Sequence, residues 1–85
     1  MRVLIPSALQ SYTGANWVEA EGATLAAVLD DLDRRYPGIR FRMIDERGAI
    51  RRHVRFFHRK VAVHDLAHPL GAGDELLIVQ ALSGG

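Results

Sequence analysis

Cysteine is absent from this chain of 85 residues. Without cysteine the chain forms no disulfide, no cysteine-ligated zinc or iron–sulfur site and no thiol nucleophile. A domain of this size buries only about 60–65% of the surface that its unfolded chain exposes, so its core is thin and leaves little room for a deep catalytic pocket. We therefore expect one domain, 1–85, that is stabilised by packing alone and resides in a reducing cytoplasm.

Long apolar runs are also missing. No stretch approaches the ~20 apolar residues that a membrane-spanning helix needs, and the apolar start of the chain is interrupted at Pro6, too early for a signal peptide. The few serines are Ser7, Ser11 and Ser83, and none lies in a Gly-x-Ser-x-Gly motif. From these absences we expect no association with a membrane and no serine hydrolase activity.

Lysine is nearly absent, since Lys60 is the only lysine beside ten arginines. Segment 34–60 holds that lysine and nine of the arginines, against only Asp45 and Glu46. The formal net charge is nevertheless +1, so the chain as a whole generates no strong field for polyanions. Two interpretations of the segment stay open: a solvated face balanced by acids elsewhere, or a basic face for an acidic partner or nucleic acid.

The first half of the chain shows a strand, a turn cluster, a second strand and a helix. Residues 2–5 are rich in β-branched residues, 7–16 contain a cluster of turn residues, and 17–21 alternate as a half-buried strand does. Thr24 is a candidate N-cap for a helix over 25–36. Its apolar stripe consists of Leu25, Val28, Leu29, Leu32 and Tyr36.

The second half predicts mainly strands. Apolar residues alternate over 39–44, but that segment is too short to decide between strand and loop. The expected strands are 50–57, 61–63 and the nearly continuous apolar run 75–82, which is typical of the centre of a sheet. The fold class is therefore α+β, a mixed sheet of about four to five strands with one main helix packed across one face.

Three groups of polar or glycine residues are candidate sites that we interpret structurally. His64 and His68 are four residues apart, but Pro69 makes a metal-binding helix doubtful, so we expect surface histidines and no metal. The aspartates of the helix, Asp30, Asp31 and Asp33, fall on different faces and are explained by solvation of the helix. No helix follows Gly71-Ala72-Gly73, so this segment is a turn and not a phosphate-binding loop.

The last strand carries more apolar residues than one face requires. Adjacent strand residues point to opposite faces, and Leu76 to Val79 and Leu82 supply five apolar side chains. If the helix covers one face only, an apolar patch is exposed on the other, and such patches often mark partner surfaces. A face covered by loops is the alternative.

The end of the sequence, Ser83-Gly84-Gly85, is not explained by packing. Two glycines maximise backbone freedom and add no side chain to a fold. Such a tail can enter a channel too narrow for any Cβ atom, and it presents one group, the carboxylate of Gly85. A carboxylate resists nucleophiles until it is activated, for example as an acyl adenylate. The pattern indicates a carrier or substrate and not an enzyme.

Residues 74–85, taken together with Gly22-Ala23-Thr24-Leu25 and Tyr36-Pro37-Gly38, resemble the ubiquitin-like sulfur carriers. This family includes carriers of the MoaD, ThiS and CysO type, which serve molybdopterin, thiamine and cysteine biosynthesis, and one member is the small subunit of molybdopterin synthase. The resemblance covers nearly the whole chain. It implies the ubiquitin-like β-grasp fold with a flexible tail, 83–85.

The resemblance also implies a reaction cycle. An adenylating enzyme would use ATP to activate Gly85, and a sulfur donor, either a sulfurtransferase or a cysteine desulfurase system, would convert the adenylate to a thiocarboxylate. An acceptor synthase would then take the sulfur for molybdopterin, thiamine, cysteine or tRNA thiolation. Gly84 and Gly85 would be the reactive tail and Leu82 and Ser83 its entry segment. The partner-binding patch would include Leu77 and Val79, whereas Leu76 and Ile78 would point inward. No tightly bound cofactor is implied.

Two other functions stay open. The chain could be a protein modifier conjugated through Gly85, because the tail chemistry is shared. It could instead be a non-enzymatic binding module for RNA or an acidic protein, with Arg51, Arg52 and Arg55 as the contact residues, although the near-neutral charge and the scarcity of aromatics count against it. One departure from the family is local: relatives have an Asn-Gly turn where this chain has 57–61, so we expect a longer or differently shaped hairpin there.

Overall fold

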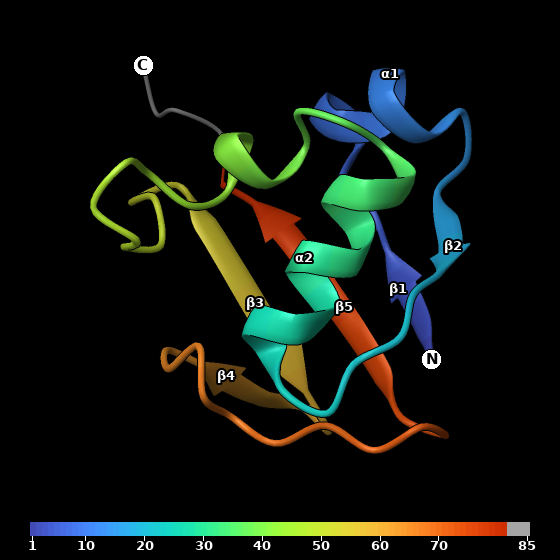
Figure 1. Ribbon diagram of the computed structural model, residues 1–85, viewed down its shortest axis with the longest axis vertical. Helices are drawn as coiled ribbons and strands as arrows, with labels where there is room; N and C mark the ends of the chain where they lie inside the picture. The colour runs from blue at the N-terminus through green and yellow to red at the C-terminus, as the bar shows by residue number, and fades with distance from the viewer. Residues whose placement is uncertain (82–85) are drawn as a thin grey trace.

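One mixed sheet of five strands organises the computed structural model, which describes residues 1–81 (Figure 1). The strand order is β2-β1-β5-β3-β4. The strands are β1 Arg2–Leu4, β2 Trp17–Glu19, β3 Val54–His58, β4 Val61–Val63 and β5 Glu75–Gln80. As predicted, the apolar last strand is central: β5 lies parallel to β1 and antiparallel to β3. The expected α+β class is confirmed.

Helix α2, Leu25–Arg35, crosses one face of this sheet (Figure 1). Its predicted N-cap is confirmed, because the hydroxyl oxygen of Thr24 accepts a hydrogen bond from the Ala27 N–H at 3.2 Å. The predicted stripe is buried against the sheet, with Tyr36 packed at its margin. The core between the two layers consists mainly of Val3, Val18, Leu25, Val28, Leu29, Leu32, Phe56, Leu76 and Ile78. Among residues 1–81, no helix is long and apolar enough to cross a membrane.

Two segments that the sequence left as turn or ambiguous are short helices. The turn cluster contains the 3-10 helix η1, Ser7–Leu9, and the single helical turn α1, Gln10–Thr13, which ends at Gly14 with φ of +70°. The ambiguous segment 39–44 contains the 3-10 helix η2, Arg40–Arg42. Both segments consist of helical elements of only three or four residues, which is too short for the hydrophobic period to distinguish a helix from a strand.

Strand β3 begins later and its turn is tighter than the sequence predicted. It starts at Val54 and not at residue 50, because Ile50 instead bridges Ile44. The register of His58 opposite Val61 leaves only Arg59 and Lys60 as the loop to β4. Both loop residues have positive φ, +53° and +69°, as a two-residue type I′ hairpin requires. Of the two expected alternatives, a longer or a differently shaped hairpin, the longer one is wrong: the loop has two residues, and Arg59 and Lys60 adopt the positive φ angles for which Asn-Gly is usual.

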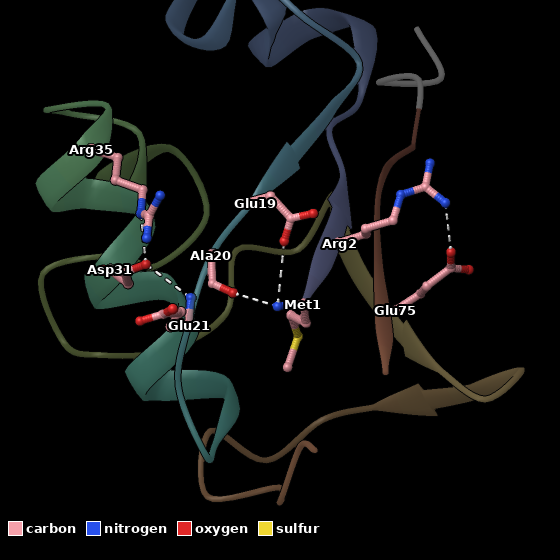
Figure 2. A network of polar contacts seen from close by, with 8 residues as sticks. All are labelled: Met1, Arg2, Glu19, Ala20, Glu21, Asp31, Arg35 and Glu75. Atoms are coloured by element: carbon pink, nitrogen blue, oxygen red, sulfur yellow. Dashed lines mark hydrogen bonds and ion pairs between the residues drawn. The ribbon is translucent and has the colours of Figure 1, made fainter. Parts of the chain in front are cut away.

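Asp31 is buried and tethers α2 to the segment after β2, whereas solvation alone was expected. The residue is 6% exposed, and its Oδ2 accepts hydrogen bonds from the Glu21 N–H at 2.9 Å and from Arg35 Nε at 2.8 Å (Figure 2). Arg34 also pairs with it. The Glu21 N–H and the two guanidinium groups hold the pKa of Asp31 below its usual range. A non-local backbone donor explains the burial.

Gly22 precedes the helix at a place where no side chain fits. A Cβ atom there would lie 2.6 Å from the Val28 nitrogen and 2.8 Å from the Ala27 carbonyl carbon, both of them backbone atoms that cannot move independently. We expect Gly22→Ala to lower the free energy of unfolding by about 2 kcal/mol, the cost of overpacking. Urea denaturation followed by circular dichroism measures it. Gly73→Ala is the matched control, because its Cβ meets nothing within 4 Å, and an equal loss in both variants would contradict the packing argument.

Candidate functional site

The side chains of β5 alternate between the core and the opposite, outer face of the sheet. Leu76 and Ile78 are buried under α2, as predicted. Leu77 is half-buried on the outer face, and Val79 on the same face is 42% exposed. The outward placement of these two predicted partner-binding residues is therefore confirmed, while their binding role stays a prediction.

Leu77 lies in an apolar row that crosses the whole outer face. Cross-strand register places Leu77 beside Leu4 of β1 and beside Phe57 of β3. The same register extends the row to both edge strands, because Trp17 lies opposite Leu4 and Ala62 lies opposite Phe57. All five side chains are half-buried. We call Trp17, Leu4, Leu77, Phe57 and Ala62 the outer row.

Charged residues flank the outer row along the strands. At the start of β5, Arg2 Nη1 donates to Glu75 Oε2 at 3.0 Å, and its guanidinium lies 4.2 Å from the centre of the Trp17 ring (Figure 2 shows the ion pair). At the other end of β5, Val79 lies opposite Arg55. The outer face thus has an apolar centre between polar margins, the composition of a typical protein interface.

The described part of the chain ends one residue after β5. Gln80 is paired with Val54, and the Ala81 N–H donates to the His53 carbonyl oxygen at 2.7 Å, the last contact along the described chain. The predicted tail residues Leu82, Ser83, Gly84 and Gly85 lie outside the described residues. Four residues beyond Ala81 span at most about 14 Å when extended. The length of the chain therefore limits the distance between the Gly85 carboxylate and Ala81 to that value. We call Ala81 the root of the tail.

A hollow beside Ala81 brings together the three arginines that the binding-module hypothesis named as contact residues. Its lining includes Arg51, Arg52, Arg55 and Ala81. Periodicity could not locate these arginines relative to the tail, because their position depends on the pairing of β3 with β5. The clustering of arginine over 34–60 was the signal that pointed to them.

A histidine pair lies at the opposite end of the sheet, where surface histidines were expected. His58 is only 11% exposed in its side chain. Its Nε2 lies 2.7 Å from Asp74 Oδ2, and its Nδ1 lies 3.0 Å from His68 Nε2. Since a carboxylate only accepts, His58 donates to Asp74. The expected surface position is confirmed for His64, which is exposed, whereas His68 is half-buried against His58, a histidine for which the sequence made no prediction. Within residues 1–81, no group of three metal-ligating side chains converges.

Asp74 makes the fold sensitive to acid. The Gly71 N–H, the His58 ring and the Arg59 guanidinium lower the pKa of Asp74 from 3.8 to about 2. Because the folded state holds this proton more weakly than the unfolded chain, the carboxylate stabilises the fold above pH 4, and that contribution is lost between pH 4 and pH 2. We expect Asp74→Asn to lower the urea midpoint at pH 7, and its difference from the wild type to shrink as the pH falls through this range.

The exposed Glu46 provides the control for this pH series. Glu46→Gln should leave the urea midpoint within experimental error of the wild type at pH 7. A difference between Asp74→Asn and the wild type that stays constant from pH 7 to pH 2 would show that the neighbours of Asp74, namely the Gly71 N–H, His58 and Arg59, do not stabilise its charge.

Sequence comparison relates the whole chain to sulfur carriers. The family model described as "ThiS family" matches residues 3–85. Sulfur carrier protein CysO of Mycobacterium tuberculosis is 36% identical over 89 residues, which cover 98% of this chain and 96% of that protein.

Solved structures share the fold. CysO in the Amycolatopsis orientalis BexX/CysO complex superposes with a TM-score of 0.90 at 33% identity, covering 99% of this chain and 98% of that one. SAMP1 from Haloferax volcanii gives a TM-score of 0.80 at 27% identity, covering 100% and 98%. The sheet with its crossing helix is the β-grasp arrangement of these proteins. The chain belongs to the ThiS family and is a sulfur carrier, a protein that acts with partner enzymes and is not itself an enzyme.

Proposed function

We propose that the working group of this carrier is the C-terminal carboxylate of Gly85. A cytoplasmic adenylating enzyme, similar to ubiquitin-activating enzymes, binds the outer row and Val79 and draws residues 82–85 into its active site. There the carboxylate is activated with ATP, receives sulfur and leaves as a thiocarboxylate. Leu82 and Ser83 are the entry segment of the tail, and Gly84 leaves the channel free of a Cβ atom.

The atoms of this cycle balance without an internal thiol. A carboxylate oxygen of Gly85 attacks the α-phosphorus of ATP, and pyrophosphate leaves. The outer sulfur of a persulfide, carried by a sulfurtransferase or a cysteine desulfurase system, then attacks the carbonyl carbon and displaces AMP, which leaves an acyl disulfide. A thiol reductant cleaves the S–S bond, is oxidised to the disulfide with the donor cysteine, and releases the thiocarboxylate. The terminal carbonyl now carries the sulfur in place of one oxygen. The absence of cysteine from the chain agrees with this route.

The observation that carries the proposal is the course of β5. This strand runs through the centre of the sheet, presents Leu77 and Val79 on the outer face, and leads directly into the Gly-Gly terminus. A partner that covers the outer row is therefore in position to receive the tail. The rigid sheet fixes where the tail begins, and the glycines leave its last residues free of side chains.

The identity to CysO favours one acceptor. Molybdopterin, thiamine, cysteine and tRNA thiolation all use carriers with this tail, and the 36% identity to CysO supports the cysteine-biosynthesis class. A synthase of that class would take the sulfur from the Gly85 thiocarboxylate and release the carboxylate for another cycle.

A second function, conjugation to other proteins, has support from one comparison. SAMP1 of Haloferax volcanii is similar over the whole chain, and related structures are described as small archaeal modifier proteins. The same acyl adenylate would then be attacked by a lysine amine, which forms an isopeptide bond and releases AMP. Host proteins heavier by the mass of this chain, with Gly85 attached to lysine, would support it.

Adenylation is tested by isotope exchange. The untagged chain is incubated with the purified adenylating enzyme of its own organism, ATP and labelled pyrophosphate, and the label entering ATP is counted. Because adenylate formation is reversible, we expect exchange that requires both proteins. Hydroxylamine should trap the adenylate as a hydroxamate on Gly85. Exchange that is unchanged when the chain is omitted, with no hydroxamate formed, would overturn the proposal.

A further inference from the structure

Three arginines lie around the root of the tail. Arg51, Arg52 and Arg55 line the same hollow as Ala81. The strand pairing that holds them there is firm, because the Ala81 N–H donates to the His53 carbonyl and Arg55 lies directly opposite Val79. We call Arg51, Arg52 and Arg55 the basic collar.

The charges of the basic collar are not neutralised by carboxylates among residues 1–81. The arginines that pair with carboxylates there are Arg2, Arg34, Arg35, Arg40 and Arg59. In the collar, Arg51 Nε donates to the Phe41 carbonyl at 2.7 Å, and Arg55 Nη1 donates to the carbonyl oxygens of Arg52 and Val54. A carbonyl orients a guanidinium without cancelling its charge.

The negative charge of Asp45 neutralises only part of the positive charge of the basic collar. Its Oδ1 accepts hydrogen bonds from the Arg47 and Ala49 N–H groups at 2.9 and 3.0 Å, which close its own turn. Those two backbone donors, together with the charges of Arg47 and Arg51, hold the pKa of Asp45 below its usual range. The carboxylate therefore stays ionised, but it makes no ion pair with Arg52 or Arg55 among the described residues. The collar keeps a net positive charge.

The length of the tail determines which part of the adenylating enzyme lies next to the basic collar when the tail is bound in the active site. An extended tail of four residues places the Gly85 carboxylate up to about 14 Å from Ala81, beside which the collar lies. The nucleotide that reacts with this carboxylate lies at the inner end of the channel, whereas the collar stays at its mouth. The collar therefore contacts the partner's outer surface and not the phosphates of ATP.

The collar also continues the outer row. Arg55 lies opposite Val79, which is 42% exposed, on the same face as Leu77. One partner surface can thus cover the apolar centre and reach the collar at its rim. RNA fits less well: the net charge is only +1, and the exposed Phe41 carries the Arg51 guanidinium 4.6 Å from its ring centre, where a base would stack.

We infer that the basic collar docks against an acidic rim around the channel mouth of the adenylating enzyme. This inference rests on the proposed function and adds the chemistry of the partner. Charges at the rim of an interface chiefly set the rate of association and its salt dependence, and they disfavour wrong partners. The collar steers the tail to the mouth, and the outer row supplies most of the contact.

A charge reversal with a matched control tests this inference. Arg52 is exposed and makes no side-chain contact needed for the fold, and Lys60 is an exposed cation at the far, β3–β4 end of the sheet (Figure 1). In the exchange assay at low salt, Arg52→Glu should raise the KM for the chain by about tenfold with kcat unchanged. Lys60→Glu makes the same change in net charge and should alter KM less than twofold. Arg52→Lys should restore the wild-type KM.

The dependence of KM on salt concentration and the binding of the chain to RNA are the remaining measurements. The tenfold effect should shrink as the ionic strength rises to about 0.5 M, because screening weakens exposed charge pairs. Equal effects of Arg52→Glu and Lys60→Glu would overturn the collar and leave adenylation of Gly85 intact. Tighter binding of the wild type to host tRNA than to the enzyme, lost in Arg52→Glu, would also overturn it. Absence of adenylation in the wild type would overturn the proposed function itself and the collar with it.

Discussion

Removal of Gly85 is expected to abolish adenylation while the fold stays intact. The shortened chain still ends in a carboxylate, but this group is displaced toward the body of the domain by about 3.5 Å, one residue of extended chain. A misplacement of even about 1 Å can cost 100-fold in rate, because the reacting atoms no longer meet in line. We therefore expect pyrophosphate exchange to fall at least 100-fold, measured with the same enzyme and ATP.

The stability of the shortened chain is the control for this deletion. The described contacts of the sheet end at Ala81, so loss of Gly85 removes none of them. The urea midpoint of the shortened chain should equal that of the wild type. A chain extended by one alanine should behave in the same way, since its carboxylate overshoots the site. Full exchange by either variant would show that the terminal position does not matter and would contradict the account.

Truncation of Leu77 is expected to weaken the partner complex strongly. Leu77 is the middle member of the outer row, between Leu4 and Phe57. Central apolar side chains of interfaces cost about 2 kcal/mol or more when they are cut back to alanine, which corresponds to about 30-fold in affinity. We expect Leu77→Ala to raise the KM for the chain about 30-fold in the exchange assay and to leave kcat near the wild-type value.

Leu66→Ala separates this effect from a loss of stability. Leu66 is half-buried like Leu77, but it packs against the core from the segment that follows β4, beside α2. Both variants should lower the urea midpoint, and only Leu77→Ala should change KM. If the two variants raise KM equally, the outer row is not the partner surface and the change reflects unfolding.

The sequence predicted those elements in which the hydrophobic pattern of a helix or of a buried strand extends over many residues. Helix α2 and the central strand β5 were identified because the stripe from Leu25 to Leu32 and the run from Leu76 to Val79 are long enough to be distinctive. Alternation placed Leu77 on the face opposite to Leu76 and Ile78, and the resemblance to the sulfur carriers indicated that its face is the outer one. Segments of three or four residues show no such period, so the helical turns near Ser11 and Phe41 were not predicted.

The remaining errors concern contacts between distant parts of the chain. Burial of Asp31 depends on the Glu21 N–H, and the half-buried position of His68, expected at the surface, depends on its contact with His58, ten residues away. No local pattern encodes either partner. The basic collar belongs to the same class: the sequence shows a cluster of arginines, but only the pairing of β3 with β5 places Arg52 and Arg55 beside the root of the tail.

The intact mass of the chain, purified from its own organism without a C-terminal tag, tests the central claim most directly. The account predicts a fraction that is heavier by one oxygen-to-sulfur exchange, located at Gly85 by fragmentation and lost on alkaline hydrolysis. Incubation with host lysate, ATP and a sulfur source should enlarge that fraction. A chain that stays unmodified in the host and after this incubation would contradict the assignment of Gly85 as the sulfur-carrying residue.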